Sequence, residues 1–380
     1  MYSDEDINAA VAAGTLTPEA AAGLRAQVSA DREMPVGDEE NFRLVTSFND
    51  IFVTIGVIIL LVAVGSIGGT AFSAIGVESL GFALASVIVA ATAWLLAEIF
   101  TRKRRMALPS IVLLTVFVWS VFFAAAGLVI TPFTLGADAG ARTGGGFDSN
   151  IIVRTLGAAV AIGWMMATGA ITVFATYLHW KRFMVPITVA AGAAALVGSM
   201  IAALMLATQA VNDGHGSYAA LPLVFISGVG VFIAAMRWDM SDRERTTRRS
   251  DVAFWLHLLA APMIAHPLFY SLGVVGGSKE IGVGAALGVV AIYVLFGLVA
   301  LAIDRRALLV SALAYVLGAL AVLFRQFGAV ELNFAFTALI IGSALLTLSV
   351  FWSPIRARLV AKLPAELRSR LPVVGTVPAV

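Results

Sequence analysis

The side chains of this sequence that have the chemistry to form a site are the few ionisable residues inside its long apolar runs. Glu98 lies near the end of one run, and His257 and His266 lie in another that also contains Pro262 and Pro267. An ionisable residue within a membrane span is costly to bury and is therefore a functional hypothesis by default. A carboxylate there can couple to a proton or a cation, and an imidazole can titrate near neutral pH.

Each of these residues also has a structural interpretation, which we favour. Glu98 precedes the basic turn TRKRR, so we expect it to form an interfacial ion pair with Lys103 or Arg105. We expect His257 and His266 to hydrogen-bond backbone carbonyls that the two prolines of their helix release. The functional alternatives are a coupling carboxylate at Glu98 and a proline-loosened helix that lines a cavity, with either histidine as a titrating group.

Metal binding, haem binding and covalent catalysis are not indicated. His257 and His266 are nine residues apart, which places them on opposite faces of a straight helix and about 13.5 Å apart along its axis. His179 and His215 are expected at opposite membrane surfaces, and the sequence has no cysteine. It also has no phosphate-binding loop and no HExxH or GxSxG motif. We therefore expect no metal, no cofactor and no catalytic residue, and an intramembrane enzyme is the least favoured function.

A second group of polar residues is expected at the outer ends of the helices. Arg154 begins one apolar run, and Arg325 and Glu331 flank a short turn between two others. The favoured interpretation is that Arg325 and Glu331 pair across this turn. The alternative is that the two arginines hold an anionic headgroup or a carboxylate near the outer leaflet, aided by His266.

Two aspartates open apolar runs in a similar way. In SFNDIFVTIG, Ser47 or Asn49 can cap the helix, and Asp50 meets the positive end of the helix dipole. Asp251 opens a later run 201 residues further on. We favour a duplicated helix-entry element for this pair over a coupling site.

These residues must be positioned by membrane helices. The chain is 60% hydrophobic and 13% charged, against about 25% charged in soluble domains, and its mean hydropathy is +0.95. Apolar runs of about 18 residues or more recur, each long enough to cross a bilayer. The predicted class is an all-α, polytopic membrane helix bundle. Its ten spans are predicted at 50–72, 79–100, 107–131, 151–178, 183–209, 219–236, 252–275, 281–303, 307–325 and 332–352.

The distribution of Lys and Arg predicts the orientation of these spans. With the N-terminus in the cytoplasm, only four of the 25 basic residues fall on the outer side: Arg142, Arg154, Lys279 and Arg325. All the others fall in cytoplasmic segments, a strong positive-inside asymmetry. Both termini are therefore predicted to be cytoplasmic. The basic loops also account for the pI of about 9.0 without a nucleic-acid partner.

Three regions are predicted. Residues 1–46 form a soluble helical hairpin, about 4–13 and 17–32, followed by a linker. Residues 47–353 form the transmembrane bundle. Residues 354–380 form a basic amphipathic tail on the inner membrane face, broken near Pro364. Spans one to four and seven to ten also resemble each other, which predicts an internal repeat whose copies enter the membrane in the same direction.

The stretch Gly14-Thr15-Leu16-Thr17-Pro18-Glu19-Ala20, followed by Leu24-Arg25, resembles the N-terminal hairpin of a bacterial group of multi-pass membrane proteins of unknown function. The resemblance implies a short hairpin before a string of spans, and it carries no activity. Ten spans with both termini inside also resemble the drug/metabolite transporter superfamily. The halves of those proteins have opposite orientations, however, whereas the copies here have the same direction.

The leading functional expectation is a transporter, or a lipid- or small-molecule-handling protein, of the bacterial cytoplasmic membrane. Its cavity is expected among spans one, four, seven, nine and ten. The alternative is a non-enzymatic accessory or assembly protein that recruits partners through its hairpin and tail. The expected partners are the bilayer itself, anionic lipid at the basic loops and tail, and a protein at residues 1–46. No nucleic acid is expected.

Overall fold

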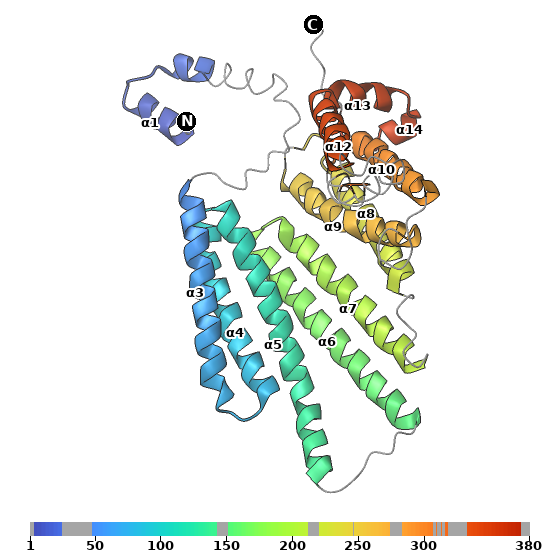
Figure 1. The fold of residues 1–380 in the computed structure, drawn as a ribbon. Coiled ribbons are helices and arrows are strands. Elements are labelled where there is room, and N and C mark those ends of the chain that lie inside the picture. Colours follow the sequence, from blue (N-terminus) through green and yellow to red (C-terminus); the bar gives the residue numbers. More distant parts are fainter. Residues whose placement is uncertain are drawn as a thin grey trace.

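The fold was determined as a computed structural model of residues 1–380. The structure describes residues 4–24, 48–142, 151–211, 220–245, 247–273, 283–306 and 333–373, together with residues 309, 313, 316 and 317. All of these described segments are helical or form turns, so the predicted all-helical class is confirmed for them (Figure 1).

Five long helices form the first half of the bundle, and each packs against the next one along the chain (Figure 1). Short turns join most of them, because apolar helices that follow one another closely pack as antiparallel neighbours. α5 runs well beyond the predicted end of the third span, through Pro132. The five helices are α3 (Phe48–Ser73), α4 (Glu78–Ala97), α5 (Ala107–Arg142), α6 (Ile151–Phe183) and α7 (Ile187–Val211).

The second half is built around the antiparallel pair α8 (Ala220–Met240) and α9 (Arg248–Ser271), which has one of the most extensive contacts in the chain. α9 also packs against α7, which connects the two halves. The remaining helices of this half, in which α10 packs against α13, are α10 (Val283–Ile303), α12 (Asn333–Val350), α13 (Trp352–Ala361) and α14 (Ala365–Arg368).

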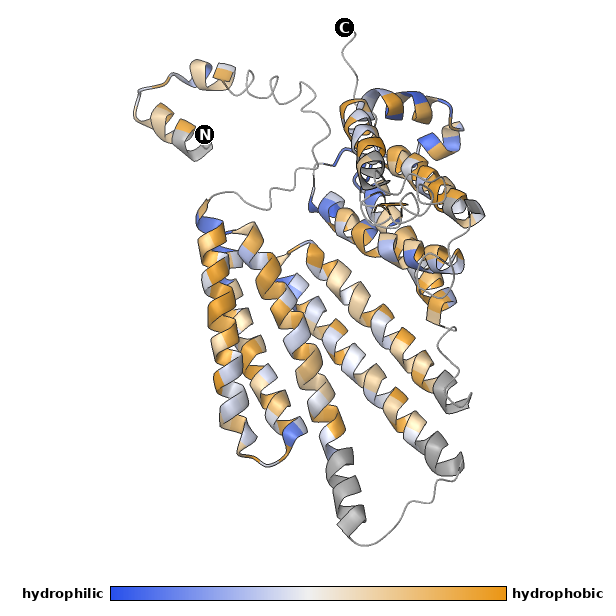
Figure 2. Cartoon of the chain, viewed as in Figure 1, coloured by the Kyte–Doolittle hydropathy of each residue, from blue (hydrophilic) through white to orange (hydrophobic). Residues whose placement is uncertain are grey.

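Seven helices of the described part are long and apolar enough to cross a membrane. Residues 342–350 of α12 form with α13 a further pair that is bent by 71° and passes the same test. Hydrophobic residues predominate along the α3–α7 ribbons, and strongly hydrophilic residues lie mainly at the end that carries the turns after α4 and α6 (Figure 2). A membrane helix bundle is therefore supported. The count of ten spans stays a prediction, since most of 307–325 lies outside the described residues.

The hydrophilic end carries the turns after α4, α6, α8 and α10, and we call it the basic end. α4 continues there into a π-helical turn, η1 (Glu98–Lys103). The turns are sharp, because each contains a non-glycine residue with a positive φ: Arg105, Met184, Arg245 and Asp304, at 52° to 58°. These turns bring helix ends close together and place their charged residues side by side.

The N-terminal residues form part of the predicted hairpin. α1 (Asp4–Ala12) is followed by a turn at Gly14 with φ of 71°, and a second helix starts after Thr17. The hydroxyl of Thr17 accepts a hydrogen bond from the backbone N–H of Ala20 at 3.2 Å and so caps the start of this helix. Residues 25–47 lie outside the described residues.

Candidate functional site

A buried charge network joins three helices at the basic end. The Asp239 carboxylate, in the last turn of α8, lies 2.9 Å from Nε2 of His257 on α9. Its other oxygen accepts a hydrogen bond from Nη2 of Arg305, just after α10, at 2.6 Å. The side chains of Asp239 and His257 are 0% exposed, and that of Arg305 is 2% exposed.

The network extends to the start of α9. The Arg305 guanidinium also donates to the backbone oxygen of Ser250 at 2.9 Å, so it is satisfied on two sides. The ring of His257 packs edge-on against Phe232, with centroids 5.1 Å apart. Its Nδ1 is buried and has no hydrogen-bond partner among the described residues. One carboxylate thus balances one guanidinium and fixes one imidazole.

A second group of charges lies beside the first, around Asp304. This carboxylate accepts hydrogen bonds from Arg245 at 2.9 Å and from the indole N–H of Trp352 at 2.7 Å. Nε of Arg356 lies 3.6 Å from it. Burial, together with the neighbouring Arg305 charge, lowers the pKa of the Arg245 guanidinium from its ordinary value. One carboxylate thus meets three groups from two segments, the turn between α8 and α9 and helix α13.

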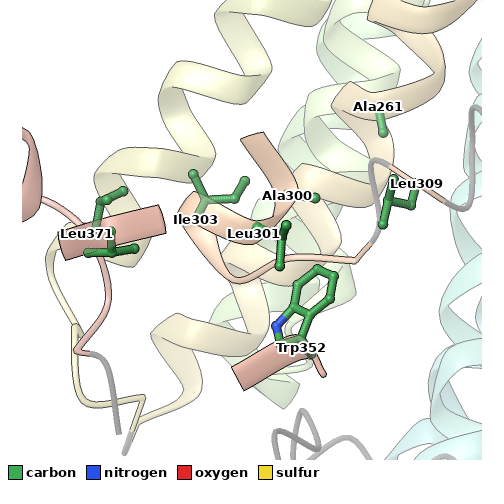
Figure 3. Close-up of a cluster of buried hydrophobic side chains, with 8 residues drawn as sticks. Ala261, Ala300, Leu301, Ile303, Leu309, Trp352 and Leu371 are labelled. Atoms are coloured by element: carbon green, nitrogen blue, oxygen red, sulfur yellow. The ribbon is translucent and has the colours of Figure 1, made fainter. Parts of the chain in front are cut away.

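The same contacts fix the C-terminal segment on the bundle. Arg356 donates to the backbone oxygen of Pro372 at 2.9 Å, and Arg243 donates to that of Leu371 at 2.9 Å. The side chains of Trp352 and Leu371 join an apolar cluster with residues of α10 such as Leu301 and Ile303 (Figure 3). The tail is therefore folded against the protein through one face.

Glu98 is ion-paired, as expected, but with different partners. Its carboxylate accepts from Nε and Nη2 of Arg182 at 2.6 and 3.1 Å, and from Arg102 at 3.1 Å. Arg182 lies in the last turn of α6, and α6 contacts η1. The sequence pointed to Lys103 and Arg105, because only neighbours along the chain are visible in it.

The side chain of His179 is 1% exposed, so it is buried inside the protein. It lies near the basic end of α6, among the rings of Trp94, Phe117 and Phe183. Nδ1 of His179 is 3.2 Å from the hydroxyl of Thr188. Of the aromatic residues in this cluster, only Phe183 is close to His179 along the chain, four positions later. It was therefore the one local sign of the cluster in the sequence.

The two helix-entry aspartates lie where the sequence places them, in the first turns of their helices. Asp50 is 2% exposed, and its backbone oxygen accepts from Thr54 at 2.6 Å. Asp251 is half-buried in α9, which is capped by Thr247.

The other predicted site residues make fewer described contacts or lie outside the described residues. His266 is half-buried on α9, and its ring lies 6.4 Å from that of Tyr270. Arg154 lies in the first turn of α6, and its side chain is outside the described set. Arg325 and Glu331 lie outside the described residues. The described part holds no group of three acidic or histidine side chains placed to bind a metal ion.

An apolar cleft of about 430 Å³ lies between α5, α6 and α7, and we call it the α5–α7 cleft. The hydroxyls of Thr115, Thr172 and Ser199 line it, but each donates to a carbonyl of its own helix, at 2.7 or 2.8 Å. The cleft therefore suits an apolar ligand. Its lining residues are Leu114, Thr115, Val118, Trp119, Phe122, Met165, Thr172, Ile187, Ala191, Ala194, Ala195, Gly198, Ser199 and Ala202.

A second apolar cleft, of about 590 Å³, is lined by α4 and α5 together with Ile171 of α6. Neither cleft is lined by Glu98, His257 or His266. These charged residues and the two apolar clefts are thus separate features of the described structure. Comparisons with protein-family models, with curated proteins and with solved structures found no match to this chain.

Proposed function

We propose that this chain is an integral membrane protein that handles a lipid or another apolar small molecule, and that the α5–α7 cleft is its binding site. The volume of the cleft, about 430 Å³, lies in the range of ligand pockets, about 300–1,000 Å³. Its lining offers no unsatisfied hydroxyl, so an apolar chain loses no hydrogen bond when it enters. This apolar cleft within the spanning helices is the observation that carries the proposal.

The length of the cleft fits an acyl chain. Its lining along α7 runs from Ile187 to Ala202, which is about 22 Å at the helical rise. One leaflet of hydrocarbon is about 15 Å thick, half of the core. A chain in the cleft would extend from the basic end past the middle of the bilayer.

The proposed orientation places the basic end in the cytoplasm of a bacterial cell, with ten spans and both termini inside. The positive-inside asymmetry supports it. The cleft would then open toward the inner leaflet, from which a lipid can enter laterally.

We also propose that spans one to four and spans seven to ten are copies of one four-helix unit, with spans five and six as the link between them. Glu98, at the end of the second span of the first unit, contacts Arg182 at the end of the fourth. Asp304, just after the second span of the second unit, lies 3.6 Å from Arg356, just beyond the fourth. The same connection between second and fourth spans supports a parallel duplication.

The binding site can be tested by filling it. A Cβ added at Gly198 meets nothing within 4 Å, so Gly198→Phe places a ring in the cleft. Gly163, on α6 outside the cleft, is equally open, and Gly163→Phe is the matched control. The probe is cis-parinaric acid, added to delipidated protein and followed by energy transfer from tryptophan. Trp119, in the cleft wall, is a suitable donor.

We expect Gly198→Phe to weaken binding of this probe by about tenfold or more, a loss of about 1.4 kcal/mol, and Gly163→Phe to leave it unchanged. Equal affinity in the two variants would show that the cleft is not the site.

The second candidate function is an accessory or assembly protein, and the folded tail favours it. Arg358, Lys362, Arg368 and Arg370 are exposed on a segment that is fixed to the bundle, which suits a docking surface. Deletion of residues 1–44, or of the tail, would then remove a copurifying partner and leave parinaric acid binding unchanged.

A further inference from the structure

We propose that the last described residues of the chain, Leu371, Pro372 and Val373, are a tethered ligand that occupies a peptide-binding slot at the basic end. Arg243, in the turn between α8 and α9, donates from Nε to the oxygen of Leu371 at 2.9 Å, and its backbone oxygen accepts from the N–H of Val373 at 3.3 Å. Arg356 of α13 donates to the oxygens of Pro372 and Val373 at 2.9 and 3.4 Å. We call this place the tail slot.

The side chain of Leu371 is the anchor of this ligand. It is 8% exposed and joins the apolar cluster that contains Leu301 and Ile303 of α10 (Figure 3). Pro372, directly after it, is also buried, and its ring restricts the backbone, which lowers the entropy lost on binding. In peptide recognition, main-chain hydrogen bonds supply affinity and side-chain pockets supply specificity. The tail slot therefore fits a non-helical segment in which a large aliphatic residue precedes proline.

A solvent-exposed connector separates this ligand from the rest of the tail. Every residue in 364–370 is exposed, and the hydrogen bonds described for the backbone of this connector stay within residues 364–371. α13, by contrast, is anchored on its own account, because its Trp352 and Val360 are 2% exposed. Release of residues 371–373 would therefore leave α13 in place.

The short connector explains how so small a ligand fills the slot. A segment on a short tether is present at an effective concentration on the order of millimolar. The slot therefore needs only a weak intrinsic affinity to be occupied by its own segment, while a free peptide of the same chemistry must compete with that segment. The contact is thus autoinhibitory, because the slot accepts a second peptide only when its own ligand is weakened or released.

The tail slot joins the α8–α9 turn to α13. Arg243 lies two positions before Arg245, which binds Asp304, and Nε of Arg356 lies 3.6 Å from the same carboxylate. An occupied slot therefore holds this turn against α13 beside Asp304. The tail slot shares no residue with the α5–α7 cleft, so the two proposals can be tested separately.

The first test is a gain of binding. The probe is a fluorescent peptide with the sequence of residues 367–373, amidated at its C-terminus, and its anisotropy is followed with the purified full chain. We expect Leu371→Ala to bind this peptide at least about tenfold more tightly than the unchanged chain, because the variant weakens only the tethered competitor. Leu367→Ala, at a connector leucine that is 51% exposed, is the matched control and should bind the peptide no better than the unchanged chain. Adding Arg243→Ala to Leu371→Ala should remove the gain.

Equal affinity for the peptide in Leu371→Ala and Leu367→Ala would overturn the proposal. Equal binding of a control peptide, in which alanine replaces the leucine that corresponds to Leu371, would also overturn it, since the attraction would not use the anchor. Loss of the folded bundle in Leu371→Ala would contradict a tethered ligand as well, because the tail would then be an integral part of the fold.

Arg243→Ala alone gives a second test that leaves the apolar core intact, since this residue is exposed. The variant removes the Nε donor to Leu371, so limited trypsin digestion of the full chain should cut after Arg370 about tenfold faster. Arg249→Ala, at another exposed arginine of the basic end, is the control and should leave the rate unchanged. Equal rates in the two variants would show that the slot does not hold the tail.

Discussion

The Asp239 carboxylate and the Arg305 guanidinium meet 2.6 Å apart, and both side chains are almost completely removed from solvent. They come from the end of α8 and from the turn after α10, 66 positions apart. A buried pair of this kind gains little net free energy from its attraction, because both charges must lose their hydration. The pair instead favours one arrangement of the helices, since either charge would be costly to bury in this place without the other.

Breaking this pair is expected to destabilise the bundle strongly. Asp239→Asn removes the carboxylate that Arg305 and His257 share, and breaking a buried ion pair by removing one partner typically costs about 3–5 kcal/mol. Thermal unfolding in detergent and unfolding by SDS titration measure the change. Glu366→Gln, at an exposed carboxylate of α14, should change stability by no more than about 0.5 kcal/mol.

Removing both charges together should restore most of that loss. The double variant Asp239→Leu/Arg305→Met replaces the pair by apolar side chains, and buried pairs replaced in this way are often neutral or stabilised. If the double variant is as unstable as Asp239→Asn, the two side chains do not act as a pair.

The ion pairs of Glu98 should respond to salt in a different way. Its partners Arg102 and Arg182 are about half exposed, so their attraction to Glu98 is screened when the Debye length falls to about 3 Å at 1 M salt. Glu98→Gln should lower the melting temperature at low ionic strength and have little effect at high ionic strength. The decrease in melting temperature caused by Asp239→Asn should persist at both low and high ionic strength. A salt-independent effect of Glu98→Gln would contradict this assignment.

Close packing of α6 on α7 depends on Gly169. A Cβ at this position would overlap Oγ and Cβ of Ser199. Gly169→Ala should therefore destabilise the protein by about 1–3 kcal/mol through overpacking. Ser199→Gly in the same chain should relieve the overlap, while Ser199→Ala should not, because it retains Cβ. Gly163→Ala is the control, since nothing lies within 4 Å of its added Cβ.

The predicted orientation can be measured directly, because the chain contains no cysteine. Ile75→Cys introduces a thiol in the exposed turn between α3 and α4, and Arg104→Cys introduces one at the basic end. In intact cells, a membrane-impermeant maleimide should label Cys at position 75 and reach position 104 only after permeabilisation. The reverse pattern would place the basic end outside and refute the positive-inside prediction.

Most of the helices could be located from the sequence. The predicted limit 50–72 corresponds to α3 at Phe48–Ser73, and 281–303 corresponds to α10 at Val283–Ile303. Such agreement is expected, because a bilayer requires continuous apolar runs and the end of a run is visible in one dimension. The predicted limits were wrong where a helix continues into polar sequence. α8, for example, ends at Met240, four residues beyond the predicted end at 236.

That error concealed the main polar site. With the sixth span ending at 236, Asp239 fell in a loop and was not considered as a partner of His257. His257 was instead assigned to carbonyls released by Pro262 and Pro267, which are close to it along the chain. The actual partner is 18 positions earlier, on an antiparallel helix.

The sequence by itself determined that this protein consists of apolar helices and where most of them begin and end, and it predicted that the basic turns gather at one end. Those properties depend on local composition and on the thickness of a bilayer. Only the tertiary structure decided which charges meet and where space remains. The rotation and depth of neighbouring helices determine four features: the Asp239–His257–Arg305 network, the burial of His179, the folded tail and the α5–α7 cleft. Apolar surfaces of similar composition encode that register weakly, so the pairing of distant side chains becomes visible only once the helices are packed.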